Sequence, residues 1–361
     1  MRSASRRRVG GCSACFDEVF GPASAEGRHP QTMPMAMQPT AFGTRPRTGP
    51  NRIFPALADD SDPAFTLLTG WLCTRLDHED GRVQRAILRD VSTGRLRHVD
   101  PGLVVVCADT LRSPQLLFAS GIRHPALGVR LNEHAFLTGR AFPDVDRLGI
   151  DPATIAPPRE GEWATGGYWL PHSDDDQPFH GQMMERPHLD ESGRTIDYSI
   201  GLALYVPTEV RAENRLEFSE DELDATGMPR IAIHFGYSER DQRLIALARD
   251  RQREAAERLG RFDPETDSAL LQPGSSLHFT GTVRMGAQDD GESVCDTDAR
   301  VWGFGNLYLA GNGVIPTAVT ANSTLTGMTF AVRTARAIAR AVADADTVRE
   351  LADHQMKGTL R

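Results

Sequence analysis

The spacing of hydrophobic and polar residues changes several times along the chain. Residues 1–62 are rich in Pro, Gly, Arg and Ser and show no sustained period, so we expect mainly loop there, with disorder near the start. Residues 65–76 contain two short apolar runs that predict a strand, and residues 82–90 alternate apolar and polar positions, as a half-buried strand does. The turn sequence Ser92-Thr93-Gly94 predicts that residues 95–99 return as the hairpin partner.

A buried strand followed by a helix is predicted next. Residues 103–107 read LVVVC, a continuous run of the kind that is buried on both faces in a parallel sheet. Residues 113–121 predict a short helix, because Pro114 suits a first helical turn and Gly121 a C-terminal stop. A strand that enters a helix is half of a nucleotide-binding unit, although one such half alone does not define a function.

The middle of the chain is rich in strands. Acidic and Pro/Gly-rich loops separate five apolar segments between residues 142 and 262, a pattern that favours an antiparallel sheet. These segments are residues 167–171, 181–185, 200–206, 215–218 and 230–237. Ser238-Glu239-Arg240-Asp241 resembles a capping box, and the helix that it opens has an apolar face and ends at Gly260.

Composition narrows the class of protein. With 361 residues, 40% of them apolar and 25% charged, the chain is expected to be soluble and globular, with about two domains. The net charge of −9 disfavours binding to nucleic acid or to an anionic membrane, since both need a positive surface. No apolar run approaches the roughly 20 residues of a membrane helix, and the basic start lacks the apolar region of a signal peptide. We therefore expect a cytoplasmic protein.

The cysteines do not predict a disulfide framework or a metal site. There are five, an odd number, and they are widely spaced. Cys12 and Cys15 form a lone C-x-x-C with no second pair and no histidine partners, so zinc is not expected and no metal is predicted. Cys73 and Cys107 lie in apolar runs, where cysteine behaves as a small buried hydrophobic residue.

The segment from residue 277 to residue 331 carries the candidate chemistry. His278 precedes Gly281 and Gly286, which permit a tight backbone path close to a ligand. With an ordinary pKa of about 6.5, a neutral imidazole is available near pH 7 to take a hydroxyl proton. A buried structural histidine is the alternative, but the sequence that follows favours a base.

That following sequence is an apolar strand, a Gly-rich turn and a helix. The apolar strand at residues 306–310 leads into Gly311-Asn312-Gly313, where backbone amides can approach a phosphate or a flavin edge. Asn322 or Ser323 can cap the helix that runs to about Ala343. The positive end of that helix would stabilise a reduced, anionic flavin.

These residues resemble the glucose-methanol-choline (GMC) oxidoreductases, and within them the pyranose-oxidase and C-glycoside-oxidase branch. LHFTGTVRMG, residues 277–286, and NLYLAGNGVIPTAVTANSTLT, residues 306–326, resemble its long C-terminal motifs. Shorter segments resemble the sugar site, an N-terminal loop and a general family segment; they are residues 178–182 (PFHGQ), 33–36 (MPMA) and 113–122 (SPQLLFASGI). The resemblance covers roughly residues 28–343.

The resemblance implies FAD-dependent oxidation of a sugar hydroxyl to a ketone. His278 matches the catalytic base and Asn322 the second member of a His/Asn pair. Removal of the hydroxyl proton makes the carbinol C–H a better hydride donor to the flavin, while Asn322 would donate a hydrogen bond to the developing alkoxide. The other matches are Gln182 at a substrate contact, Gly311, Asn312 and Thr324 along the flavin, and Cys73, whose backbone would meet the adenine end.

The resemblance also implies a fold and a division into domains. We expect a mixed α/β (α+β) chain that forms the C-terminal part of a GMC-type fold, with an incomplete FAD-binding Rossmann-like domain and an antiparallel-sheet substrate domain. The expected divisions are an irregular or disordered N-terminus at 1–27, a partial FAD-binding domain at 28–140, a substrate domain at 141–262, the return of the FAD-binding domain with the catalytic pair at 263–345, and a tail at 346–361.

The chain departs from the family pattern in three places. No G-x-G-x-x-G fingerprint opens it, and Val9-Gly10-Gly11 is at most the remnant of a later landmark, so we expect a truncated chain whose activity in isolation is open. Ser323 replaces the usual proline, which is expected to loosen the entry to the helix. Ala108-Asp109 stands where many members have Ala-Gly.

Two other functions stay open. The chain could be a non-catalytic half-protein that pairs with a separate FAD-domain polypeptide, or a GMC dehydrogenase that acts on a non-sugar alcohol. The electron acceptor could be oxygen or a quinone, and a homo-oligomer is also open. The PFHGQ segment favours a sugar or glycoside substrate.

Overall fold

The computed structural model of the chain divides into two compact units, which we describe separately. Unit 1 consists of Met1–Thr69, His134–Thr208 and Tyr237–Ser276, and unit 2 of Gly70–Glu133, Glu209–Gly236 and Leu277–Arg361. The structure describes Cys15, 31–33, 35–38, 46–59, 62–154, 167–170, His172 and 178–358. Val9-Gly10-Gly11, Cys12 and Pro34, which the sequence singled out, lie outside the described residues.

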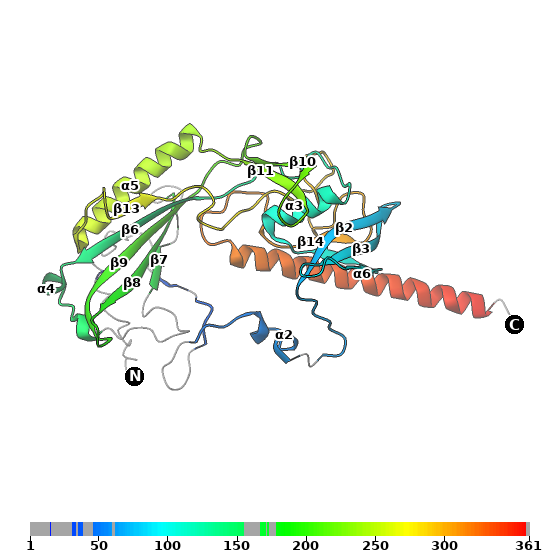
Figure 1. Ribbon diagram of the computed structural model, residues 1–361, viewed down its shortest axis with the longest axis horizontal. Coiled ribbons are helices and arrows are strands. Elements are labelled where there is room, and N and C mark those ends of the chain that lie inside the picture. The colour runs from blue at the N-terminus through cyan, green and yellow to red at the C-terminus, as the bar shows by residue number, and fades with distance from the viewer. Residues whose placement is uncertain are drawn as a thin grey trace, which may run out of the picture. The chain divides into compact units, whose positions relative to one another are not determined.

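Unit 1 is built on a seven-stranded antiparallel sheet (Figure 1). Its path runs β1-β7-β8-β9-β6-β12, and β13 also pairs with β6. The strands are β1 (Gln31–Thr32), β6 (Ala135–Pro143), β7 (Gly167–Leu170), β8 (His180–Leu189), β9 (Thr195–Val206), β12 (Gly260–Arg261) and β13 (Ser268–Leu270). The three predicted strand segments between residues 167 and 206 therefore lie side by side in one antiparallel sheet, as expected.

Helix α5 (Glu239–Leu259) packs its apolar side against this sheet. Its start is the predicted capping box: the Ser238 hydroxyl accepts from the Asp241 N–H at 3.1 Å, and the Asp241 carboxylate accepts from the Ser238 N–H at 2.9 Å. Such a cap stabilises a helix by about 1 kcal/mol. Buried Ile245 and Ala256 face the core, and the helix ends before Gly260 as predicted. Short helices complete unit 1: η1 (Pro50–Arg52), α2 (Ala56–Asp59), α4 (Val145–Leu148) and η2 (Pro152–Thr154).

Unit 2 contains a three-stranded antiparallel sheet and a short parallel one. The first joins β2 (Trp71–Glu79), β3 (Arg82–Asp90) and β4 (Leu96–Val99), which confirms the predicted hairpin. The second pairs β5 (Val104–Val106) with β14 (Leu307–Leu309) in parallel, as the LVVVC run predicted. The chain is thus mixed α/β with antiparallel sheets, whereas the incomplete Rossmann-like domain stays a prediction.

Helix α3 (Asp109–Ala119) follows β5 and starts four residues before the predicted helix. Asp109 has a left-handed φ of 63°, and its carboxylate accepts from the N–H groups of Leu111 and Arg112 at 2.6 and 3.0 Å. This cap starts α3 at Asp109, and the helix continues through Pro114. The prediction had used the proline to mark the first turn and therefore began too late.

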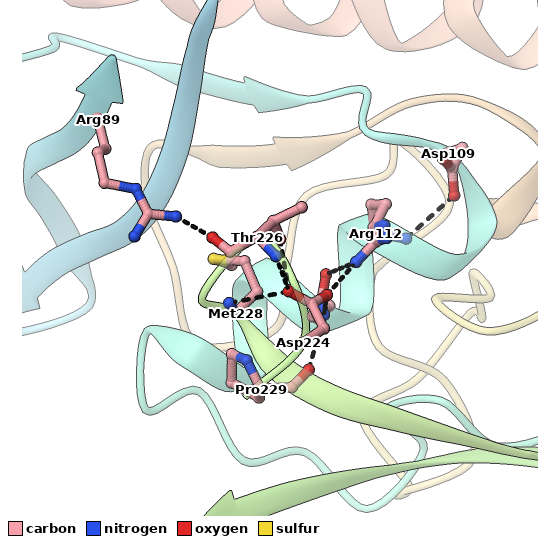
Figure 2. A network of polar contacts seen from close by, with 8 residues as sticks. Arg89, Asp109, Arg112, Asp224, Thr226, Met228 and Pro229 are labelled. Carbon is pink, nitrogen blue, oxygen red and sulfur yellow. Dashed lines mark hydrogen bonds and ion pairs between the residues drawn. The ribbon is translucent and has the colours of Figure 1, made fainter. Parts of the chain in front are cut away.

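The strands β10 (Arg215–Leu223) and β11 (Pro229–His234) form their own two-stranded sheet in unit 2. The expectation that all the strand segments between residues 142 and 262 join one sheet is therefore wrong for this pair. The reason is a tertiary contact at the hairpin turn, where Asp224 accepts hydrogen bonds from Arg112 and Gln115 of α3 at 2.7 and 3.1 Å. Figure 2 shows how Asp224 points toward Arg112 while Thr226 of the same turn contacts Arg89.

Asp224 is the centre of this network. Burial by itself would raise the pKa of its carboxyl, but hydrogen bonds from Thr226, Arg112 and Gln115 outweigh burial and hold the pKa well below its usual range. The charged carboxylate therefore fixes the hairpin to α3 at every physiological pH.

The last helix, α6 (Thr324–Gly358), follows the short helix η3 (Asn312–Val314). It continues past the predicted end at Ala343 and through most of the stretch 346–361 that was predicted to be a tail. The sequence between Ala343 and Gly358 contains neither glycine nor proline, so nothing in it stops a helix. In the described part of the chain no helix is long and apolar enough to cross a membrane, and no cluster of His, Cys, Asp and Glu could hold a metal ion.

Candidate active site

The structure brings His278 and Asn322 together in unit 2. The side-chain nitrogen Nδ2 of Asn322 lies 3.4 Å from Nε2 of His278. An amide nitrogen can only donate, so this contact requires an Nε2 that carries no proton. Burial lowers the pKa of His278, which favours the same neutral form at pH 7. At 3.4 Å the contact is long, so an alcohol oxygen placed beside both groups could give its proton to Nε2 and accept a hydrogen bond from Nδ2.

The backbone before His278 has an unusual conformation. Leu277 has a φ of 59°, in the left-handed region that a branched side chain seldom adopts, and its side chain is 75% exposed. Such a residue persists only where the surrounding structure holds it. Here the next residues are held: Thr280 and Asn132 exchange backbone hydrogen bonds of 2.8 and 3.0 Å.

Thr110, at the start of α3, holds the same loop from a second side. Its hydroxyl donates to the carbonyl of Phe279 at 2.8 Å, and its own carbonyl accepts from the hydroxyl of Thr282. Gly281 lies between these contacts with a φ of 94°, and a Cβ there would come within 2.3 Å of the Arg130 carbonyl oxygen. The loop after His278 therefore needs glycine at this position and is fixed by α3.

Asn312 and Ser323 link the turn after β14 to the start of α6. The Asn312 amide donates to the Ser323 hydroxyl at 2.7 Å, and the Ser323 carbonyl accepts from the Gly327 N–H at 2.9 Å. A Cβ on Gly327 would lie 2.4 Å from the Asn312 Oδ1, so glycine leaves room for this side chain. Ser323 is fully buried, and its hydroxyl ties the helix entry to the turn, contrary to the expectation that replacing proline would loosen it.

The predicted cofactor residues divide between two places in unit 2. Gly311 has a φ of 103° and open space where a Cβ would stand, so its backbone can be approached closely by a flat ring or a charged group. Asn312 follows it directly, and Thr324 begins α6. These three positions fit the edge of a flavin in kind, because they combine an open backbone with the positive end of a helix. Cys73 lies elsewhere, in β2, where its thiol contacts the carbonyl of Arg75 at 3.9 Å.

The predicted substrate residue Gln182 lies in unit 1, on β8. Its amide nitrogen is 3.2 Å from Nε2 of His180, two positions earlier on the same face of the strand. His180 is only 2% exposed, and burial, aided by the charge of His172, lowers its pKa to about 4. Neutral His180 thus accepts from Gln182 at Nε2 and carries its proton on Nδ1, for which the described residues offer no hydrogen-bond partner. Trp169, on the neighbouring strand β7, is paired with Gln182.

The sequence analysis did not identify His180, which contacts Gln182, or Thr110, which holds the loop after His278. His180 stands inside the PFHGQ segment, and its spacing of two from Gln182 in a strand was a signal that both side chains share a face. Thr110 gave no signal, because its partners lie 169 and 172 positions further along the chain.

Two family models match the chain, and both are described as GMC oxidoreductase. The N-terminal model matches residues 10–136, and the C-terminal model matches residues 210–331. The C-terminal match includes His278, Gly311 and Asn322.

The curated relatives that the chain resembles include sugar and glycoside oxidases. It is 43% identical over 291 residues to a C-glycoside 3-oxidase of Microbacterium trichothecenolyticum, a match that covers 77% of this chain and 54% of the relative. It is 38% identical to the C-glycoside 3-oxidase of Arthrobacter globiformis, over 82% of this chain and 57% of the relative. It is 29% identical to the pyranose 2-oxidase of Emericella nidulans, over 77% and 55%. The chain therefore spans about half the length of the relatives that it matches.

A solved structure shares the fold. The crystal structure of a pyridoxine 4-oxidase from Mesorbium loti superposes with a TM-score of 0.55 and 20% sequence identity, over 81% of this chain and 61% of that one. At this identity the likeness concerns the fold alone.

Proposed function

Because the chain belongs to the GMC oxidoreductases, we propose that it carries the base and the substrate-binding residues of an FAD-dependent enzyme. The proposed reaction oxidises a secondary hydroxyl of a pyranose or of a sugar glycoside to a ketone. The observation that carries the proposal is the 3.4 Å contact between His278 Nε2 and Asn322 Nδ2. The names of the similar C-glycoside 3-oxidases and pyranose 2-oxidases support a sugar substrate.

In this proposal His278 and Asn322 both act on the oxygen of the substrate alcohol. The neutral His278 takes the hydroxyl proton at Nε2, and Asn322 donates a hydrogen bond to the oxygen as it becomes an alkoxide. Bound FAD supplies the acceptor for the hydride that leaves the carbinol carbon. A positioned base contributes about 10²–10⁴-fold to such a reaction, and one hydrogen bond to the developing charge is worth a few kcal/mol.

Gln182 orients the sugar in this proposal, and His180 orients Gln182. Because the Gln182 amide nitrogen donates to His180, the direction in which its carbonyl oxygen points is set by a buried partner. A carbonyl oxygen so directed is an acceptor for a sugar hydroxyl. The flavin would lie along Gly311, Asn312 and Thr324, and Cys73 would contribute its backbone at the adenine end. The same proposal includes the predicted division into an FAD-binding domain (28–140 and 263–345) and a substrate domain (141–262).

The test uses flavin absorbance. Purified protein is loaded with FAD and mixed without oxygen with a panel of pyranoses, C-glycosides and choline-like alcohols. We expect loss of flavin absorbance with a sugar or a C-glycoside, and no loss in a His278→Gln variant that still binds FAD. Turnover of choline-like alcohols alone, or reduction that is unchanged in the variant, would contradict the proposal. Reoxidation by air or by a quinone then identifies the electron acceptor.

A further inference from the structure

Unit 2 contains a cavity of about 170 Å³ with charged side chains in its lining. Two arginines and one glutamate face it among small residues; its lining consists of Pro125, Ala126, Val129, Arg130, Ala212, Arg284, Gly291 and Glu292. The volume is several times the roughly 30 Å³ that one water molecule occupies in the liquid. The cavity therefore has room for a small ion as well as for water.

The charges around the cavity are unbalanced. Arg130 forms an ion pair with Glu292. Arg284 is half-buried, its Nε is closed off from solvent, and no hydrogen-bond acceptor for that atom lies within the described residues. Nor does any carboxylate of the described part of the chain lie within ion-pair distance of Arg284, although Glu292 and Asp290 act on it from further away. Of the two arginines at the cavity, therefore, only Arg130 has a close negative partner among the described residues.

Arg284 cannot relieve this situation by losing its proton. Burial and the neighbouring charge of Arg130 lower its pKa, but a guanidinium stays charged in proteins. A buried donor without a partner costs about 1–3 kcal/mol, and more when it is charged. An acceptor that carries negative charge is the group that would satisfy it best.

We propose that this cavity binds a small oxyanion, such as inorganic phosphate or a short carboxylate, on the guanidinium of Arg284. A planar guanidinium matches the oxygens of either group in a bidentate manner. The site would be separate from the His278–Asn322 pair and independent of any flavin. It would nevertheless act on the same segment, because the residues on both sides of Arg284, Val283 and Met285, donate backbone hydrogen bonds of 3.0 Å to Gly313 and Val314.

The experiment is thermal unfolding of the chain in phosphate, in acetate and in chloride at matched ionic strength and pH. Because a ligand that binds only the folded state stabilises it, we expect a saturable rise of about 2–4 °C in at least one of the first two anions. The anion that produces the rise shows whether the cavity binds a phosphate or a carboxylate. A rise that does not saturate, or equal curves in all three salts, would overturn the proposal, since phosphate stabilises proteins generally by exclusion from their surface.

Three variants separate binding from general salt effects. Arg284→Gln should abolish the saturable rise. Glu292→Gln should lower the apparent Kd about 10-fold, because it removes a competing negative charge and releases Arg130. Glu239→Gln, an exposed residue on α5 in unit 1, is the matched control and should respond like the parent chain. If Arg284→Gln does not fold, Glu292→Gln decides: an unchanged or weaker response in that variant would overturn the proposal.

Discussion

The amide of Asn322 lies 3.4 Å from the imidazole of His278, across 44 positions of sequence. Each residue is fixed by a different element: His278 precedes a loop held by the start of α3, and Asn322 precedes a helix held by Asn312. The pair is therefore set by the packing of α3, η3 and α6 within one unit. In the proposed function, this geometry lets a base and a hydrogen-bond donor reach one alcohol oxygen.

The first prediction concerns the base itself. His278→Ala should slow the reduction of bound flavin by sugar about 10²–10⁴-fold, because loss of a general base has effects of that size. FAD binding should be retained. Stopped-flow absorbance measures the rate, and His98→Ala on β4 is a matched control that should behave like the parent protein. A reduction rate in His278→Ala that equals the control would remove His278 from the mechanism.

The pH dependence of flavin reduction follows from the same residue. Burial lowers the pKa of His278 below its ordinary value of 6.5. Since the base works in its neutral form, the rate should stay constant as pH falls through 6.5 and decline only at a lower pH, as the folded-state pKa is reached. Reduction rates measured between pH 4.5 and 8 give this apparent pKa, and a decline that begins above pH 7 would contradict the prediction.

The segments that the sequence predicted well are those with local signals. The capping box at Ser238 and the 3.6-residue period define α5 without reference to any other part of the chain. The run at 103–107 likewise predicted a parallel strand, and β5 pairs with β14 in parallel. The pairing of His278 with Asn322 followed from a resemblance to long motifs, which carry three-dimensional information that periodicity lacks.

The segments that the sequence predicted poorly depend on distant contacts. The hairpin β10–β11 has the pattern of any antiparallel pair. Contacts with distant parts of the chain, among them the bonds from Arg112 and Gln115 to Asp224, place it in unit 2. Thr110 has its role through partners more than 160 positions away. The burial of Ser323 could not be foreseen either, since its value as an acceptor depends on the position of Asn312.

A third prediction uses the titration of His180. Burial lowers its pKa to about 4, below the 6.5 of the unfolded chain. Between pH 6.5 and 4 the unfolded state binds the extra proton, so stability should fall as the pH falls through this window and change no further below about pH 4. A difference of about 2.5 pH units corresponds to roughly 3 kcal/mol. Urea unfolding at pH 7.5 and 4.5 measures the change.

His180→Gln should remove this part of the pH dependence, because glutamine does not titrate in that range. His188→Gln, on the same strand, is the matched control and should keep it. The prediction fails if His180→Gln and the control lose equal stability between the two pH values. The same variant should also raise the KM for sugar more than it lowers kcat, since in the proposed function His180 acts through Gln182.

The fourth prediction concerns Thr110 as a positioning residue. Thr110→Val keeps the shape of the side chain but removes the hydrogen bond to the Phe279 carbonyl, one residue after His278. Loss of one such bond is worth about 1 kcal/mol, so flavin reduction should slow about 5-fold with little change in KM. Thr110→Ser retains the hydroxyl and should restore the rate. Equal rates for valine and serine at this position would show that the bond does not position His278.

The last prediction tests the link between the turn after β14 and α6. Gly327→Ala would place a Cβ 2.4 Å from Oδ1 of Asn312, closer than non-bonded atoms approach, so the Asn312 side chain must shift. We expect that shift to weaken its 2.7 Å bond to Ser323. Overpacking of this kind typically costs about 1–3 kcal/mol of stability. In a helix alanine is otherwise favoured over glycine by about 1 kcal/mol, so the two effects oppose each other. Gly236→Ala, where a Cβ meets nothing within 4 Å, is the control and should be nearly neutral.

We expect Gly327→Ala to lower the urea midpoint and weaken FAD binding, because displacement of Asn312 disturbs the backbone at Gly311. An increase in stability with unchanged FAD affinity would show that the Asn312–Ser323 contact does not shape the proposed cofactor site.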